Sequence, residues 1–517
     1  MRAAIARPPG LAAAWLVVCA SGTCAISPGC GRHDAAPAQP ALQIVGESTR
    51  RRTIDPVPQT TLWFDGARVT LLAARGETLG LQVLHRGGGP VALTLRAASS
   101  APAGGGGGAN SGSGGASSIQ VRGYAVELLE VRRPSTEMYG GSHGPGVYAE
   151  GLSPAAVPTT DPAYFELEVA RDAPAGVVEG ELTVGGRSVP VVLTIAPVTL
   201  PPMPLRVWAY EDPWESRWAG SSERDCAALF RAYGVLLFPD VRLEDWPARR
   251  AEVTGLRDLP VWISDDPGRA AEQVKAWIAA TAGTEHLPFA IPIDEPRTPE
   301  LRRRVRTLAD AVRAAGGGPT RFRYAVTAAP HPDLGDSIDL YIAPGAVHLA
   351  GDRVARWTYN GGPPYAGSMV LDAEPPGMRT WGWIAWRWQV PIWYVWDGLY
   401  WHDRHNRKKT PMSSRKLDLR DPISFDDGED RGNLDGVLAL PGCQPTLRMA
   451  ALRRGYQDHQ LLELAAACNK PAADQVAADL VPRALGDAGS KPSWPSDEAP
   501  WEAARRRLIE LASCGAR

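Results

Sequence analysis

The nine residues 288–296 have the sequence PFAIPIDEP, an apolar run that leads directly into two adjacent carboxylates and a proline. A short, continuous apolar run is typical of a strand buried on both faces in a parallel sheet. Asp294 and Glu295 would then lie at the carboxyl end of that strand, where barrel enzymes keep their active sites. Adjacent carboxylates beside a buried strand are costly unless they are used. The stretch therefore predicts an α/β domain and the position of its chemistry.

On both sides of this run, strand-like segments alternate with helix-like ones. The clearest helix-like segment is 299–315, with Thr298 as its N-cap and Pro299 at its first position; two others are 224–233 and 268–281. No dinucleotide-binding Gly-x-Gly-x-x-Gly follows an early strand. We therefore expect a (β/α)8, TIM-like barrel over residues 201–445. Its strands would be 205–210, 235–238, 260–263, 288–293, 321–327, 338–342 and 354–359, with at least one more in the Trp-rich stretch from Trp381.

The chain before the Pro-rich segment 200–204 has a different pattern. Apolar residues there recur at every second position in short runs, which predicts an antiparallel β-sandwich over residues 58–200. The Gly/Ser-rich tract 103–118 is expected to be a loop between two of its strands. After the barrel, helices at 445–468 and 502–513 predict a C-terminal helical segment, 446–517. The expected chain is thus multidomain, with a sandwich, a barrel and a helical extension.

The N-terminus carries basic residues followed by an apolar run, 11–26, and small residues before Cys30. This pattern predicts a secretory leader over 1–30, and Cys30 is a candidate for lipidation, with Cys24 a weaker one. Residues 31–57 are expected to be a flexible tether. The interpretation is an exported bacterial protein, either secreted or an outer-membrane or cell-surface lipoprotein.

Neither a metal nor a cofactor is expected. Cys226, Cys443, Cys468 and Cys514 form no Cys-x-x-Cys pair, and the sequence leaves open whether they form disulfides or stay as buried thiols. His402-x-x-His405 and the acidic stretch 426–435 lack the ligand sets of zinc and calcium sites. A net charge of −2 at pH 7 also offers no summed positive field for nucleic acid.

Tryptophan is abundant, with 18 in the chain, and many of them lie in the stretch 379–401. Flat indole faces pack against the apolar faces of sugar rings, but they also fill protein cores. Since so many indoles are crowded into so short a span, we interpret part of the stretch as a wall of sugar-stacking surfaces and the rest as core.

Several segments of the chain resemble the catalytic domain of glycoside hydrolase family 123 and its relatives, from about residue 60 to residue 470. Two of them are the strand end Ile293-Asp-Glu-Pro296 and the pair Trp357-x-Tyr359. The others are Trp383-x-x-Trp386 through Gly398-Leu-Tyr-Trp401, the segment 435–442, a closing helix from Arg448 to Asp458, and a sandwich turn at 172–180.

The resemblance implies removal of terminal β-linked N-acetylhexosamine, with N-acetylgalactosamine favoured, by a retaining, substrate-assisted route. Asp294 would orient and stabilise the 2-acetamido group as its carbonyl oxygen attacks the anomeric carbon. Glu295 would protonate the leaving oxygen and then deprotonate the incoming water. The expected partner is a glycan, and the residues expected to bind it near the two acids are Tyr359, Arg379, Trp383, Trp386, Asp397 and Trp401.

Two alternatives stay open at this point. The chain could be a surface carbohydrate-binding lipoprotein with an inactive barrel. It could also be a two-carboxylate glycosidase on another sugar, with Glu211, Asp212 or Asp397 as the partner of Glu295. The charged segment 402–430 departs from the family pattern, so the sugar and the linkage are left open, as are lipidation and the oligomeric state.

Overall fold

The computed structural model describes residues 42–86, 89–96, 118–253, 256–345, 354–403 and 416–516. The expected leader with Cys30, and nearly all of the Gly/Ser-rich tract 103–118, lie outside the described residues. The expected tether 31–57 lies partly inside them, and there the structure differs from the expectation. Its residues Leu42–Gly46 form a fully buried strand, β1, which pairs antiparallel with β3 (Thr78–His85).

The first half of the described chain forms two sheets that share one apolar core. One sheet has the order β1-β3-β7-β5-β6, and the other has the order β2-β9-β8-β4. Leu81 and Phe165 of the first sheet are buried in one core with Leu182 and Leu193 of the second. Two sheets in face-to-face contact bury their alternate side chains in this way. The further strands are β2 (Val69–Arg75), β4 (Val91–Leu95), β5 (Ile119–Val131), β6 (Gly146–Pro154), β7 (Ala163–Val169), β8 (Gly176–Val184) and β9 (Arg187–Thr199).

The second half contains one sheet of eight parallel strands, in the order β11-β10-β17-β16-β15-β14-β13-β12. Each strand falls within or beside a segment that the sequence predicted, so these strand positions are confirmed. The sheet is curled, because Trp208 of β10 lies edge-on at 5.2 Å from Phe289 of β13, although four strands separate β10 from β13. The strands are β10 (Val207–Ala209), β11 (Val235–Leu237), β12 (Asp258–Pro260), β13 (Leu287–Ala290), β14 (Arg323–Val326), β15 (Leu340–Ile342), β16 (Ala355–Tyr359) and β17 (Trp393–Val395).

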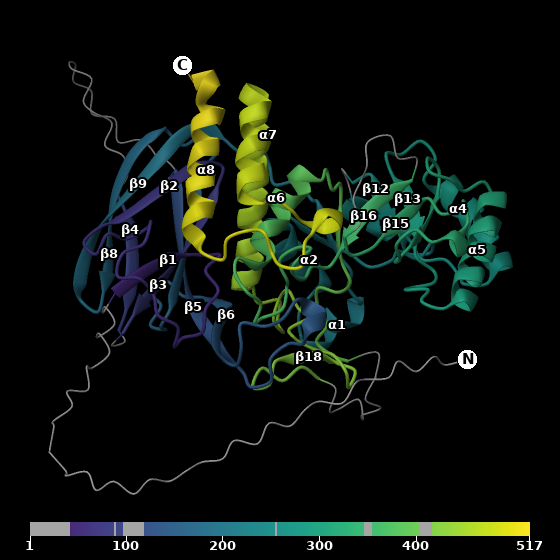
Figure 1. Ribbon diagram of the computed structural model, residues 1–517, viewed down its shortest axis with the longest axis horizontal. Helices are drawn as coiled ribbons and strands as arrows, with labels where there is room; N and C mark the ends of the chain where they lie inside the picture. Colours follow the sequence, from purple (N-terminus) through teal and green to yellow (C-terminus); the bar gives the residue numbers. More distant parts are fainter. Residues whose placement is uncertain are drawn as a thin grey trace, which may run out of the picture. The chain divides into compact units, whose positions relative to one another are not determined.

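The expected (β/α)8 barrel is wrong. The eight strands form a half-barrel, and its edges β11 and β12 are joined beyond their ends by one isolated bridge, Val241 with Val261, in place of a ladder. Helices also follow the strands unevenly. Long helices follow β12 and β13, and Figure 1 shows these helices, α4 (Pro267–Ala280) and α5 (Pro299–Ala314), together beside them. The connections after β11 and β14 carry only short turns of helix: α3 (Trp246–Arg249) with η2 (Arg250–Val253), and η3 (Pro332–Leu334).

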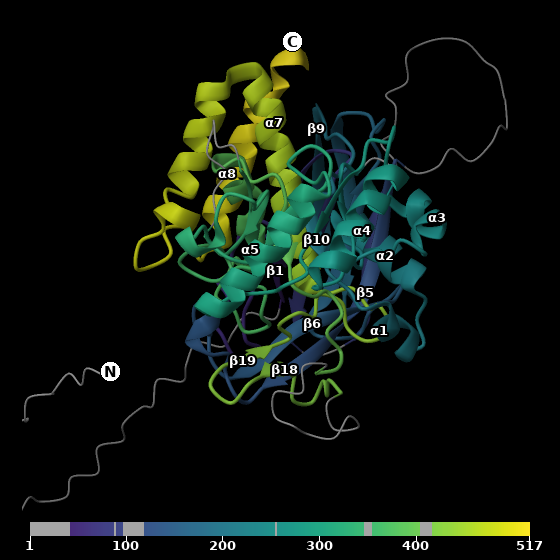
Figure 2. The same ribbon diagram turned by 90° about the vertical axis from the view of Figure 1, so that its right-hand side faces the viewer.

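Two long helices end the chain and lie side by side, α7 (Leu447–Leu480) and α8 (Glu498–Ala512) (Figures 1 and 2). Nearly every residue in the first half of α7 is buried, including Arg453 and Arg454. A helix buried all round normally carries apolar residues, so its arginines need partners. Arg454 pairs with Glu77 of the sandwich and, at 2.9 Å, with Glu502 of α8. The helices are therefore joined to the sandwich through buried charge.

The remaining elements connect these layers. They are α1 (Pro213–Trp218), α2 (Glu223–Ala232), α6 (Thr380–Arg387), β18 (Ile423–Asp426), β19 (Arg431–Asn433), η1 (Glu137–Tyr139), η4 (Gly377–Arg379), η6 (Leu485–Asp487) and η7 (Ser513–Ala516). In the part of the chain that the structure describes, no helix has both the length and the apolar character needed to cross a bilayer.

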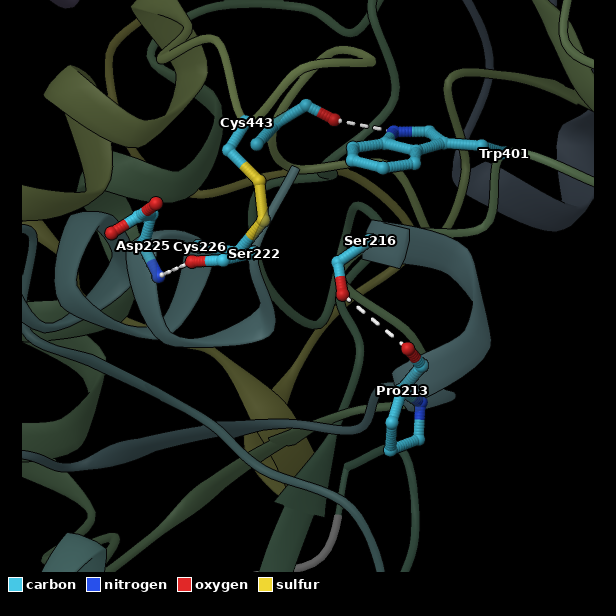
Figure 3. Close-up of a disulfide and its surroundings, with 8 residues drawn as sticks. Pro213, Ser216, Ser222, Asp225, Cys226, Trp401 and Cys443 are labelled. Atoms are coloured by element: carbon cyan, nitrogen blue, oxygen red, sulfur yellow. Dashed lines mark hydrogen bonds between the residues drawn. A yellow bond between two sulfur atoms is a disulfide. The ribbon is translucent and has the colours of Figure 1, made fainter. Parts of the chain in front are cut away.

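The four cysteines after the leader form two disulfides, which resolves the alternative that the sequence left open. Cys226 of α2 is joined to Cys443, 217 residues later, and Cys468 of α7 is joined to Cys514. Figure 3 shows the first of these bridges beside Trp401, whose indole N–H donates to the carbonyl of Ala439 at 2.9 Å. This bridge ties α2 to the segment that leads into α7.

Candidate active site

Asp294 and Glu295 lie just beyond β13, at the carboxyl end of the parallel sheet. Thr327, just beyond the neighbouring strand β14, contacts both residues. Its hydroxyl accepts a hydrogen bond from the Glu295 backbone N–H at 2.7 Å and donates one to Asp294 Oδ1 at 2.5 Å. Glu295 has a φ of +37°, a left-handed conformation that is uncommon outside glycine and tends to be found at functional sites. Thr327 thus fixes the acid pair in an unusual turn.

The two carboxylates are open to solvent. Asp294 is exposed, and the Glu295 side chain keeps 38% of its surface accessible. Arg297 lies 2.5 Å from Glu295 Oε2, but the Arg297 side chain is itself 77% exposed. An ion pair in such surroundings contributes at most about 1 kcal/mol. Glu295 can therefore exchange its contact with Arg297 for one with a ligand at a small cost in free energy.

A stack of aromatic rings lies beside the acid pair. Tyr359 of β16 stacks on Tyr394 of β17 at 5.2 Å, and Tyr394 stacks on Trp208 of β10 at 4.5 Å. Burial, reinforced by the negative charges of Asp294 and Glu295, raises the pKa of Tyr359 well above its usual range. The phenol therefore stays protonated at neutral pH and can donate a hydrogen bond. The structure brings Tyr359 together with Asp294 and Glu295.

A third acid of this half-barrel, Asp240, follows β11 in the sequence Phe238-Pro-Asp. Burial raises the pKa of Asp240 to about 7, and its charge also acts on Tyr394 of the aromatic stack. Sequence reasoning missed both Asp240 and Thr327. The signal for Asp240 was the one used for Asp294, an acid directly after an apolar strand.

Stability should depend on pH through Asp240. Its folded-state pKa of about 7 lies above its ordinary value of 3.8, so the stability it contributes is full below pH 4 and is lost as pH rises through 7. The shift limits the loss of unfolding free energy between pH 5 and pH 8 to about 3 kcal/mol. Asp240 keeps part of its surface in contact with solvent, which should reduce this loss to roughly half. Asp240→Asn should therefore gain stability over the wild type as pH rises, as measured by urea unfolding at both pH values. Parallel pH profiles of the two proteins would contradict this assignment.

Four residues that the sequence placed near the sugar lie elsewhere. Arg379 and Trp383 are fully buried, and both donate to Asp458 of α7 at 3.0 Å. Trp386 donates to Asp474 of α7 at 3.1 Å, and Trp401 is fully buried beside the disulfide. Their polar groups are satisfied inside the protein, so these indoles and the guanidinium fill and cross-link the core. These four residues therefore lie outside the candidate active site.

Of the three acids considered as partners of Glu295, two make hydrogen bonds inside the protein and the third is buried. Asp397 is fully buried and accepts from the Leu399 N–H at 2.8 Å, and Asp212 accepts from the Trp214 N–H as the N-cap of α1. Glu211 has no exposed surface, and neither of its carboxylate oxygens has a hydrogen-bond partner among the described residues. Burial raises the pKa of Glu211 well above its usual range, and its side chain does not face the solvent.

Within the described ranges, no group of three or more His, Cys, Asp or Glu side chains is arranged to hold a metal ion. His402 pairs with Glu215 at 2.8 Å, whereas His405 lies outside the described residues. In the acidic stretch 426–435, Asp427 Oδ1 accepts from the backbone N–H groups of Glu429 and Asp430. A cavity of about 320 Å³ between Trp63 and α8 does not include Asp294 or Glu295.

Comparison with known proteins places the fold. No family model matches the chain, and no curated protein matches it. Among solved structures, it is similar to a family 123 glycoside hydrolase from Clostridium perfringens, described in work on glycolipid glycan hydrolysis. The TM-score is 0.54 and the identity 9%, over 92% of this chain and 98% of that one. A candidate alpha-galactosidase from Bacteroides fragilis covers 63% of this chain and 73% of its own at 8% identity, but its TM-score of 0.17 carries no argument. The chain therefore has a distant, fold-level relation to a family 123 glycoside hydrolase.

Proposed function

We propose that the protein is a glycoside hydrolase that removes terminal β-linked N-acetylhexosamine, with N-acetylgalactosamine favoured. The observation that carries this proposal is the solvent-open pair Asp294 and Glu295, fixed by Thr327 at the carboxyl end of a parallel sheet. The fold-level likeness to a family 123 glycoside hydrolase supports it. Active sites at this end of a parallel sheet are the general rule in α/β enzymes.

The proposed role of each acid follows from the substrate group that it would contact. Thr327 already donates a hydrogen bond to Asp294 Oδ1, so the other oxygen of that carboxylate would accept from the N–H of the 2-acetamido group. The acetamido carbonyl oxygen then attacks the anomeric carbon as the bond to the leaving oxygen breaks. Glu295 gives its proton to that oxygen, and later takes a proton from the water that opens the cyclic intermediate. Since the substrate supplies the nucleophile, no second, separated carboxylate is needed.

Hydrolysis of chromogenic glycosides tests the proposal. The purified chain should release 4-nitrophenol from the β-N-acetylgalactosaminide, and more slowly from the β-N-acetylglucosaminide. The β-galactoside, which lacks the acetamido group, should not react. Turnover of the β-galactoside would indicate a two-carboxylate glycosidase, whereas binding of the N-acetyl sugars without turnover would indicate a carbohydrate-binding protein. Proton NMR of the first-formed sugar should show the β anomer, as retention requires.

A further inference from the structure

Two residues at the edge of the half-barrel extend the site beyond the acid pair. Val241, just past β11, is bridged to Val261, just past β12, and the Trp262 N–H donates to the Val241 carbonyl at 2.8 Å. Arg242 and Trp262 are therefore adjacent. The Arg242 guanidinium lies over the Trp262 ring, 4.6 Å from its centroid.

The pair faces the same side of the sheet as the interior of the half-barrel. Pro260 of β12 lies opposite Phe289 of β13, and the Phe289 ring packs inward against Trp208 and Trp357. In parallel strands, residues that lie opposite each other point to the same face, and so does the residue two positions on. Trp262 therefore faces inward, and it is 38% exposed because it lies near the rim.

The same register limits the separation from the acid pair. Its last printed partners are Pro260 and Phe289, and continuing it by two residues on each strand sets Trp262 beside Ile291. Asp294 follows Ile291 by three residues, which span at most about 11 Å of chain. Neighbouring strands lie about 5 Å apart, so the backbones of Trp262 and Asp294 are separated by at most about 16 Å. Trp262, with Arg242 over its ring, therefore lies on the strand next to the acid pair, within the length of a short glycan.

The chemistry of the pair points to an anion. Arg242 is exposed, and in the part of the chain that the structure describes it has no carboxylate partner. A guanidinium held over an indole face is attracted by the ring and keeps its planar set of N–H donors available for a ligand. Those donors match the paired oxygens of a carboxylate or a sulfate, and the contact with the ring lowers the entropy cost of binding. A neutral sugar would offer no anionic group for the Arg242 guanidinium to pair with.

We propose that Arg242 and Trp262 form a subsite for a carboxylate or sulfate on the sugar next to the cleaved bond. The inference rests on the proposed function and narrows its substrate class to acidic glycans that end in β-N-acetylhexosamine. Trp262 holds the guanidinium in place and offers its exposed part to the sugar ring, while Arg242 pairs with the anion.

Disaccharides that differ only in charge test this subsite. β-N-acetylgalactosamine linked to glucuronic acid is compared with the same sugar linked to glucose, and linkage to 6-sulfated galactose is compared with linkage to galactose. We expect kcat/KM for the acidic member of one or both pairs to exceed its neutral counterpart by roughly 10- to 100-fold, the range for a hydrogen bond to a charged group. Added salt should reduce the ratio. The pair with the larger ratio identifies the anion as carboxylate or sulfate.

Arg242→Met should bring the ratio close to one, and Arg242→Lys should restore it in part, because lysine keeps the charge without the paired donors. Arg303→Met, which removes an exposed arginine from α5, should leave the ratio unchanged and controls for net charge. A ratio of one in the wild type, or an unaltered ratio in Arg242→Met, would overturn the subsite.

The subsite can also be tested if the chain has no hydrolytic activity. Calorimetric titration of the same disaccharides into the wild type and Arg242→Met then measures affinity directly. Tighter binding of an acidic disaccharide that is lost in Arg242→Met would support the subsite even if the proposed hydrolase function failed. Equal affinity for the acidic and neutral disaccharides, or no binding at all, would refute it.

Discussion

Asp294→Asn should slow the hydrolysis of β-N-acetylhexosaminides by roughly 10²-fold or more, whatever the leaving group. The Asp294 carboxylate would stabilise the positive charge that develops on the acetamido nitrogen, and no property of the leaving group replaces that electrostatic contribution. The measurement is kcat/KM for a series of aryl glycosides with leaving groups of different acidity.

Glu295→Gln should behave differently across the same series. Its loss should be large for poor leaving groups, which need a proton, and small for 4-nitrophenol-like groups, which depart unaided. Glu300→Gln, an exposed acid in the first turn of α5, serves as the matched control and should retain full activity. Equal losses in both mutants at every leaving group would contradict the separate roles, and near-normal activity in either would remove that residue from the mechanism.

Arg454→Met should lower the free energy of unfolding by about 3–5 kcal/mol, the range for breaking a buried ion pair from one side. The Arg454 side chain is 1% exposed and contacts Glu77, which is fully buried, and Glu502. Removing the guanidinium leaves Glu77 with Arg505 as its remaining cation, and leaves Glu502 with Arg379 at 2.8 Å. The negative charge would then exceed the positive charge among buried side chains, where solvent screens charge least.

Urea unfolding followed by tryptophan fluorescence measures this loss. Arg507→Met on α8 is the matched control, since its ion pair with Glu510 is more than half exposed and should change stability by less than about 1 kcal/mol. Comparable losses in the two variants would refute a special role for the buried pair. The double variant Arg454→Met with Glu77→Gln should recover part of the stability, because it restores the charge balance.

The local features of this fold could be predicted from the sequence. The eight parallel strands lie where short apolar runs were found, and α5 begins at Pro299, with the Thr298 side chain accepting from the Leu301 N–H as its cap. The acid pair at the end of β13 was also visible, because Asp294 and Glu295 directly follow an apolar run, where carboxylates are costly unless they are used. These features depend on residues close together in the chain, so periodicity and capping chemistry are enough to find them. Export stays a prediction, since the leader lies outside the described residues.

The half-barrel, the fate of the tryptophans and the full candidate site were decided by tertiary structure. The sequence pattern indicates the number of strands. It does not indicate whether the edge strands β11 and β12 pair with each other, because that depends on the curvature of the whole sheet. Trp383 was ambiguous because an indole suits a sugar face and a core equally well, and only the position of Asp458, 75 residues away, directed it inward. Two other contacts also depend on residues that are distant in the sequence. Thr327 contacts the acid pair, and Glu77 pairs with Arg454 at a separation of 377 residues. A buried polar group needs a hydrogen-bond partner, and the tertiary fold decides which distant residue provides it. The sequence alone does not identify that residue.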